Sequence, residues 1–183
     1  GVAVPGAYLS QIDLREATLV NADFRNTQLD NGNFSEALMW DANLEGAGLW
    51  KANLKGAFLA DTNLKKANLS NANLQGADLM GANLEEAILM DANLKGTNLR
   101  YTNFEEADLM NANLEGAILE QANLEKADLT DANLKGADLT DANLKGVKSL
   151  SQSQLFEAKL CRTTLPPGIV LNSNRDCRKT NIN

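Results

Sequence analysis

The stretch DANLKGADLTDANLKG, residues 131–146, repeats nearly the same five residues three times. An alanine, an acid or amide and a leucine are followed by two polar residues, and the next alanine begins the unit again. A period of five fits neither the 3.6-residue α-helix nor the two-residue alternation of a β-strand. The repeat therefore has a geometry of its own.

The five-residue register continues without a slip from residue 9 to residue 144. Stepping by fives gives 28 positions, and all of them are Leu or Phe except Met39. Two positions earlier, 22 of the 28 residues are Ala, and 20 of the residues in between are Asp or Asn. Because the same two residues of each unit are apolar, both have to face one shared interior, and the other three face water.

Four such units close a square coil of 20 residues if each unit makes one short side and one corner. Stacked coils then pair at about 4.8 Å, the usual strand spacing, so residues 7–146 form about seven coils in a rod about 34 Å long. The sequence therefore predicts an all-β solenoid with three parts. These are an N-terminal cap or partial repeat at 1–6, the repeat domain at 7–146 and a C-terminal cap at 147–183.

These residues resemble the pentapeptide-repeat family, whose units read A(D/N)LXX. Ala132-Asn133-Leu134 and Ala142-Asn143-Leu144 match that unit directly, and the match covers residues 7–146. The resemblance implies a right-handed quadrilateral β-helix. A leucine-rich helical repeat is disfavoured, because a spacing of five scatters leucines around a 3.6-residue helix.

Sorted by side, the Asp and Asn positions form two unbroken columns on opposite sides of the coil. Stacked amides bond their neighbours above and below, so both columns are expected to stabilise the rod. The first column is Asp13, Asn33, Asn53, Asn73, Asn93, Asn113 and Asn133, and the second is Asp23, Asn43, Asn63, Asn83, Asn103, Asn123 and Asn143.

Two corner rows predict two kinds of turn. Glycine recurs along one corner, which indicates a positive φ and hence type II turns. Charged residues recur along the opposite corner and resist a positive φ, so a different turn type is expected there. The glycines are Gly56, Gly76, Gly96, Gly116 and Gly136, and the charged residues are Lys66, Glu86, Glu106 and Lys126.

The five-residue register breaks at Ser149. SQSQLFEAKL, residues 151–160, predicts a short helix that begins with a capping box of Ser151 and Gln154. Leu155, Ala158 and Phe156 are expected to lie over the last coil. TLPPGIVL, residues 164–171, predicts a turn followed by a short extended piece.

The two cysteines, Cys161 and Cys177, frame this cap. A disulfide between them would close a loop of about 16 residues and contribute about 3 kcal/mol at most. The alternative is two free thiols in a cytoplasmic protein. A bridge indicates an oxidising compartment. With a chain that begins at Gly1 rather than Met, it favours export to the periplasm or the thylakoid lumen, as the family resemblance also implies.

Composition excludes several classes of function. With 24 acidic and 17 basic residues the net charge is −7, which argues against binding to nucleic acid or to an anionic membrane. The absence of histidine removes the commonest general base and metal ligand. No apolar run approaches about 18 residues, and no glycine-rich phosphate loop follows a strand. We therefore expect no enzyme, no cofactor and no metal at the two thiols, which are too few ligands.

Apolar residues at outward positions mark two candidate surfaces, because most outward residues are polar. The first, called here the Trp40 face, consists of Leu38, Trp40, Phe58, Ala60 and Met80. The second, called the Trp50 set, lies opposite and consists of Trp50, Ile88, Met90 and Met110. Exposed clusters of aromatic residues and methionine commonly mark contact surfaces. The alternatives are that flat β faces tolerate large apolar residues, or that the patch packs two copies into a homodimer.

The sequence favours a non-enzymatic structural or protein-interaction module, either a monomer or a homodimer. It would be a rigid rod that presents flat faces to an unidentified protein partner. One alternative comes from the resemblance, since some pentapeptide-repeat proteins mimic B-DNA and bind type II topoisomerases. Residues 7–146 hold 22 acids and 11 bases. This is one net charge per ~3 Å, against one per ~1.7 Å for DNA.

Another alternative is a divalent-cation site on the acidic face of the rod. Carboxylates recur there from one coil to the next, at a separation of about 5 Å that would attract such an ion. The residues concerned are Glu85, Glu105 and Glu125, with Glu86 and Glu106 beside them.

Overall fold

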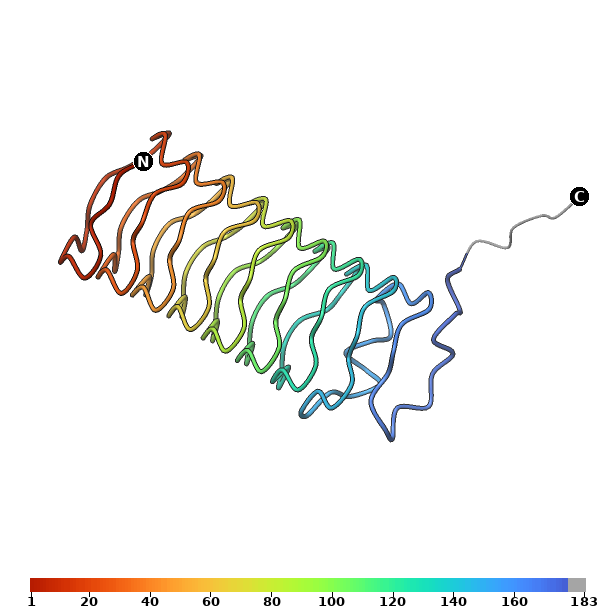
Figure 1. Ribbon diagram of the computed structural model, residues 1–183. Helices are drawn as coiled ribbons and strands as arrows, with labels where there is room; N and C mark the ends of the chain where they lie inside the picture. Colours follow the sequence, from red (N-terminus) through yellow and green to blue (C-terminus); the bar gives the residue numbers. More distant parts are fainter. Residues whose placement is uncertain (178–183) are drawn as a thin grey trace, which may run out of the picture.

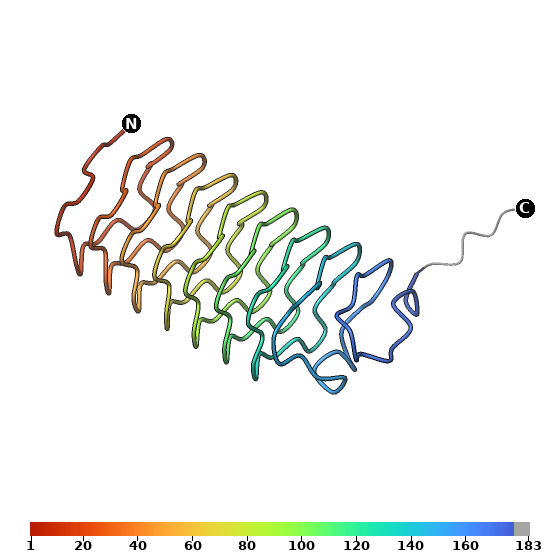
Figure 2. The same cartoon turned by 60° about the horizontal axis from the view of Figure 1, so that its bottom comes forward.

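The computed structural model describes residues 1–177, whose backbone winds into a rod of stacked coils (Figure 1 and Figure 2). Successive coils pair through single-residue parallel bridges 20 residues apart, from Ala3↔Asp23 to Asp128↔Lys148. Residues 1–177 contain no helix and no strand longer than one bridging residue. The 20-residue coil is therefore the repeating unit of the fold.

The predicted interior rows fill the axis of the rod. From Leu29 to Leu144, every residue of the leucine row is at most 1% exposed. The first coil is more open, and Leu9 and Leu14 are only half-buried. Burying a side chain of this size contributes about 1.5–3 kcal/mol, so the leucine row is the main apolar contribution to stability.

Four threonines replace alanine in the buried row, and their hydroxyls connect neighbouring coils. The Thr62 hydroxyl donates to the Met39 carbonyl at 3.0 Å, and the Thr97 hydroxyl donates to the Leu74 carbonyl at 2.9 Å. Both acceptors lie 23 residues earlier in the chain. The sequence indicates only that small residues fit this row, whereas the structure shows that each hydroxyl is satisfied. The four are Thr27, Thr62, Thr97 and Thr102.

Every corner from Gly6 to Gly146 has the same turn. The fourth residue donates its N–H to the carbonyl of the first, and the third residue has a positive φ, as in Gly56 at 65° and Lys66 at 59°. The second residue does not, so all these corners are type II turns. The expected second turn type is wrong, because closing the square coil fixes φ whichever residue stands at the corner. The charged residues concerned are Lys66, Glu86, Glu106 and Lys126, with φ between 57° and 60°.

Replacing Gln121 with glycine is expected to stabilise the protein by about 0.5–1 kcal/mol. Gln121 has φ 57°, a conformation that costs little only for glycine. The measurement is reversible denaturant unfolding. The matched control is Gln75→Gly, since Gln75 is the second residue of its turn and has no positive φ. Glycine there should destabilise, and equal changes at both positions would contradict this account of the corners.

Most members of the two asparagine columns bond the coil before them. Asn123 Nδ2 donates to Asn103 Oδ1 at 3.0 Å, and Asn123 Oδ1 accepts the Glu125 N–H at 3.2 Å. Each column has one gap within the described residues, between Asn93 and Asn113 and between Asn63 and Asn83. The expected amide ladders therefore exist in interrupted form.

Replacing Asn123 with alanine is expected to destabilise the rod by about 2 kcal/mol. The change removes its bond to Asn103, its bond from the Asn143 amide at 3.0 Å and its bond from the Glu125 N–H. The matched control is Asn93→Ala, which loses only one inter-coil amide bond and should cost about 1 kcal/mol. A reversible melt in which both variants lose less than about 0.5 kcal/mol would refute the stabilising role of the columns.

After Ser149 the chain continues the solenoid as a partial coil shifted by one residue. The bridges Asp138↔Lys159 and Asn143↔Thr164 span 21 residues instead of 20. The predicted helix over 151–160 is wrong, because residues 152–157 form turns. Pairing across the coils replaces helical hydrogen bonding, and the Lys159 N–H donates to the Ala137 carbonyl at 2.9 Å.

The reciprocal bonds of the predicted capping box are present although no helix follows. The Ser151 N–H donates to Gln154 Oε1 at 2.9 Å, and the Gln154 N–H donates to Ser151 Oγ at 3.3 Å. Gln154 Nε2 also donates to the Leu129 and Ala132 carbonyls, at 2.8 and 3.1 Å. The Gln154 side chain thus satisfies carbonyls at the end of the last regular coil. Of the residues expected over that coil, Leu155 and Ala158 are buried, whereas Phe156 is exposed.

The segment 172–177 closes this end of the rod. Arg175 donates to the carbonyls of Leu155, Phe156 and Ala158. The Leu160 N–H donates to Asp176 at 2.8 Å and holds the pKa of that carboxyl below its usual value. A disulfide joins Cys161 and Cys177.

Between the partial coil and this closing segment lies the predicted turn. The Ile169 N–H donates to the Pro166 carbonyl at 3.4 Å, and Gly168 has φ 90°. No strand follows it as far as residue 177. The remainder of the predicted cap, 178–183, lies outside the described residues.

Candidate functional site

The Trp40 face lies on one side of three successive coils. The bridges Leu38↔Phe58 and Phe58↔Asp78 place these residues one above another. The rings of Trp40 and Phe58 meet edge to face, with centroids 6.1 Å apart and planes 68° apart. Trp40, Phe58 and Met80 are 39%, 40% and 39% exposed, and Leu38 and Ala60 are half-buried.

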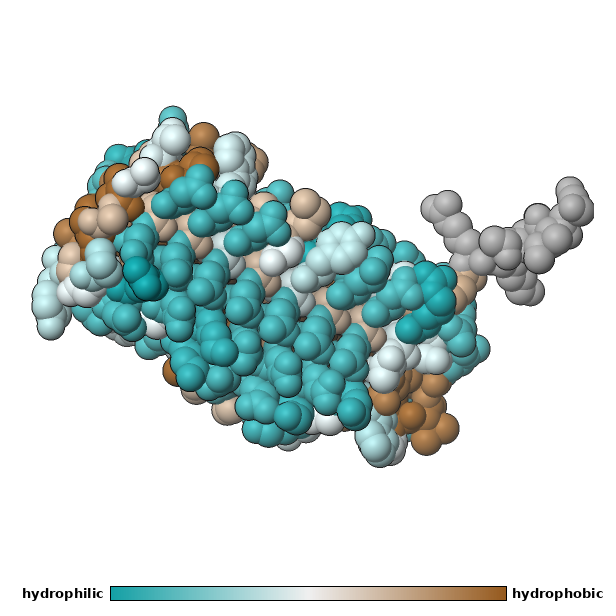
Figure 3. All heavy atoms as spheres, in the orientation of Figure 1, coloured by the Kyte–Doolittle hydropathy of each residue, from teal (hydrophilic) through white to brown (hydrophobic). Residues whose placement is uncertain are grey.

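The position of these residues in the repeat explains their exposure. Leu38 and Phe58 replace the central Asp or Asn of their units, which points outward. Trp40 and Met80 stand at the second residue of a corner turn, another outward position. The interior row beneath is already filled, so these side chains have no place inside the rod. In the view of Figure 3, hydrophilic residues cover most of the rod, and hydrophobic residues gather over the N-terminal coils and the cap.

The Trp50 set is less continuous than the sequence indicates. Ile88 lies beside the outward row that carries Met90 and Met110, but Ser70 occupies that row between Trp50 and Met90. The Lys51 ammonium lies 4.3 Å from the centroid of the Trp50 ring and covers part of it. The structure therefore places Trp50 apart from the other three members of the set.

The stacked glutamates are held by lysines of neighbouring coils. Glu85 pairs with Lys65 at 2.9 Å, and Glu125 pairs with Lys145 at 3.2 Å. The hydrogen bond from Lys145 lowers the pKa of Glu125, with a further contribution from Asn143. Within residues 1–177 no group of three or more His, Cys, Asp or Glu is arranged to hold a metal ion. These contacts give the divalent-cation alternative no support.

Lys126 engages the remaining carboxylates of that face. It pairs with Glu106 at 2.8 Å and lies 4.0 Å from Glu105. The hydrogen bond from Lys126 lowers the pKa of Glu106. Lys66 lies 3.5 Å from Glu86 in the same way, so this face is a lattice of ion pairs rather than a field of free carboxylates.

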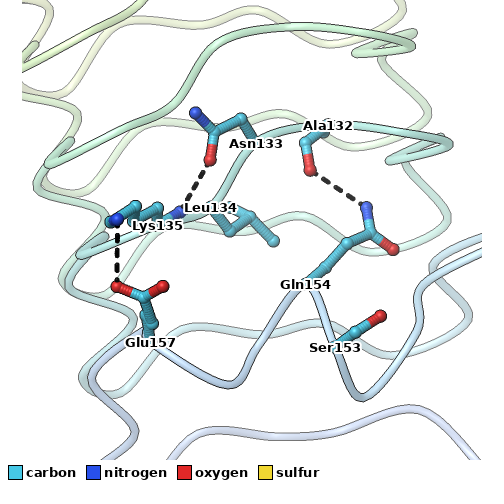
Figure 4. A pocket seen from close by; sticks show the side chains of 7 residues that line it. All are labelled: Ala132, Asn133, Leu134, Lys135, Ser153, Gln154 and Glu157. Atoms are coloured by element: carbon cyan, nitrogen blue, oxygen red, sulfur yellow. Dashed lines mark hydrogen bonds and ion pairs between the residues drawn. The ribbon is translucent and has the colours of Figure 1, made fainter.

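Two hollows lie at the cap. The first, of about 330 Å³, opens where Gln154 reaches in toward Ala132 beside the Lys135–Glu157 ion pair (Figure 4). It exists because the one-residue shift leaves Asn133 without a bridge to the partial coil. The second, of about 500 Å³, lies beside the disulfide and is lined mainly by charged and polar side chains. Neither holds an arrangement of nucleophile and base.

None of the described residues belongs to a helix that is long and apolar enough to cross a membrane.

Comparison with known proteins agrees with the geometry. The model of pentapeptide repeats matches this chain in eight copies, over residues 6–41, 42–79, 77–116, 87–125 and 107–146. A search of curated proteins finds no match.

Two solved structures illustrate the likeness. A pentapeptide repeat protein from the thylakoid lumen of Arabidopsis thaliana is 30% identical, with a TM-score of 0.51. That alignment covers 51% of this chain and 66% of the other, just under two thirds of its length. QnrB1, a plasmid-mediated fluoroquinolone resistance protein, is 16% identical over 94% of this chain and 90% of its own, with a TM-score of 0.52. At that identity the second likeness shows the fold alone.

The family match spans nearly the whole of the repeat domain and well over half of the chain. The five-residue register, the buried Leu and Ala rows and the uniform corner turns are the structural expression of that match. They also agree with the right-handed β-helix that the family's solved structures imply. The chain belongs to the pentapeptide-repeat family.

Proposed function

We propose that this chain is a non-enzymatic interaction module, a rigid rod of about seven coils whose Trp40 face binds a protein partner. The observation that carries the proposal is the exposed edge-to-face pair of Trp40 and Phe58. Aromatic side chains bury large areas at interfaces and are enriched among the residues that dominate binding energy. Met80 and Leu38 extend the same apolar surface along the rod.

The construction of the rod favours this role. Each coil is hydrogen-bonded to the next on all four sides, so the outward rows keep fixed positions. A surface that is already ordered loses little conformational entropy when a partner binds. The Trp40 face therefore offers a flat, preorganised apolar surface instead of a pocket.

The test is affinity capture from an extract of the source organism. The wild-type chain is compared with Trp40→Asp/Phe58→Asp and with the control Trp50→Asp/Ile88→Asp, after each has shown an unchanged melting curve. The expected result is a protein retained by the wild type and the control but not by the Trp40 face variant. If that protein is a second copy of this chain, the face is a homodimer interface. Identical eluates from all three chains would refute the proposal.

The DNA-mimic alternative has weaker support. A mimic needs a dense field of unpaired negative charge. Here ion pairs such as Lys95–Glu115 at 3.0 Å and Lys126–Glu106 at 2.8 Å run between coils. The Trp40 face also breaks the polar surface that a mimic of DNA requires.

We also infer that the chain works in an oxidising compartment, the thylakoid lumen or the periplasm. The disulfide between Cys161 and Cys177 supports this location, because such bonds persist mainly outside the reducing cytoplasm. The similarity to a protein of the Arabidopsis thaliana thylakoid lumen points the same way. Mass spectrometry after alkylation of a native extract tests it. Two alkylated thiols would place the chain in a reducing compartment.

A further inference from the structure

Building on the function proposed above, we infer that the partner of the Trp40 face is a protein segment with an apolar or aromatic centre flanked by lysine or arginine. Carboxylates border the face along both of its edges. Glu16 and Glu36 stand at the corner on one edge, and Asp41 and Asp61 stand at the corner on the other. All four are exposed.

These four carboxylates have no cationic partner within ion-pair distance among residues 1–177, unlike the stacked glutamates elsewhere on the rod. The two arginines of the N-terminal coils are already engaged. Arg15 pairs with Asp13 at 2.8 Å, and Arg25 pairs with Asp23 at 2.7 Å. Lys55, next to the corner at Gly56, is the one other basic residue along this border in the described chain. The rim of the Trp40 face is therefore acidic and uncompensated.

Two glycines let the rim carboxylates lie beside the apolar side chains. A Cβ placed on Gly81 would lie 2.2 Å from Asp61 Oδ1, so the Asp61 carboxylate extends over the corner next to Met80. A Cβ placed on Gly56 would lie 3.5 Å from Glu36 Cγ, so the Glu36 side chain extends toward the coil of Phe58. At the far end of the face, Asp78 adds a carboxylate that accepts from the Asn98 amide at 2.7 Å.

The Trp50 set lacks this pattern. Lys51 lies over the Trp50 ring, and the glutamates on the adjoining corner, Glu86 and Glu106, are paired with Lys66 and Lys126. Charges at the rim of an interface select partners and speed their encounter, and they do so by complementarity. An acidic rim around an apolar centre thus selects basic flanks around an apolar centre, and the attraction weakens as salt screens it.

The test is selection from a phage library of random 12-residue peptides on the full disulfide-bonded chain, with counter-selection on Trp40→Asp/Phe58→Asp. Enriched peptides are synthesised, and their affinities are measured for the wild type, for Glu36→Gln/Asp61→Asn and for the control Asp91→Asn/Asp131→Asn. The control removes two exposed corner carboxylates of another edge. All variants are first shown to melt like the wild type.

We expect peptides with an apolar or aromatic centre and flanking Lys or Arg. Their affinity should fall about five- to tenfold on the rim variant, and by a similar factor from 50 to 300 mM NaCl, with no change on the control. Peptides that require Trp40 and Phe58 but carry no basic excess, or that bind the rim variant equally well, would overturn this inference and leave the proposed function standing. A selection that yields no peptide dependent on Trp40 and Phe58 would count against both.

Discussion

Replacing Phe104 with alanine is expected to lower the free energy of unfolding by about 3–5 kcal/mol. The Phe104 side chain is fully buried and lies in register between Leu84 and Leu124 on the axis of the rod. The coils above and below are held by backbone bonds, such as Phe104 N to the Asn123 carbonyl at 2.7 Å, so they cannot collapse into the cavity. The measurement is reversible denaturant unfolding followed by circular dichroism.

The matched control is Phe104→Leu. Leucine occupies the equivalent position in the neighbouring coils, so this change should cost only about 1 kcal/mol. If the alanine and leucine variants were equally stable, the axis would not be a tightly packed column and the account of the core would be wrong.

Replacing both cysteines, as Cys161→Ser/Cys177→Ser, is expected to destabilise the cap by about 3 kcal/mol, the value for a loop of this length. The disulfide fixes the segment whose Arg175 and Asp176 bond the partial coil. Because each coil contacts only its neighbours, the loss should remain local. Amide hydrogen exchange should therefore accelerate over residues 155–165 and stay unchanged over the coils before Leu124.

Wild-type protein treated with a reductant is the control for the two serines, because Cys161 is buried and a serine there adds its own cost. Reduced wild type and the double variant should exchange alike. Unchanged protection of residues 155–165 in both samples would show that the disulfide does not hold the cap.

The sequence predicts the interior of this protein well because the same two positions of every unit are buried. The row from Leu29 to Leu144, the asparagine columns and the outward placement of Trp40 and Phe58 all follow from that register. The expectation at Lys66 failed for a physical reason. Residue preference favours a negative φ there, but closure of the coil imposes φ 59°.

The C-terminal cap was harder to predict because its hydrogen-bond partners are distant in the sequence. The segment 151–160 carries the signal of a helix start, and Ser151 and Gln154 do form the reciprocal bonds. The carbonyls of the preceding coil compete for the same groups, however, and Gln154 and Lys159 bond across to them. Local sequence does not report that competition.

Of the candidate surfaces, the neighbours within the Trp40 face could be derived from the 20-residue coil alone. The Trp50 set was divided by Ser70, and the cation–π contact of Lys51 depends on side-chain conformation that the register does not specify. The acidic rim was also missed, since it becomes visible only when the two bordering corners are placed beside the face. A count of unpaired carboxylates on the adjoining corners would have found it.

Photo-crosslinking from position 80 is the most direct test of the Trp40 face as a protein-binding surface. Met80 is replaced with the photoreactive residue p-benzoylphenylalanine, and the same residue is placed at Met110 on another side of the rod as a control. After irradiation in an extract of the source organism, we expect one adduct of defined mass from position 80. That adduct should be absent from position 110 and absent when Trp40→Asp/Phe58→Asp is added. No adduct from position 80, or the same adducts from both positions, would contradict the account.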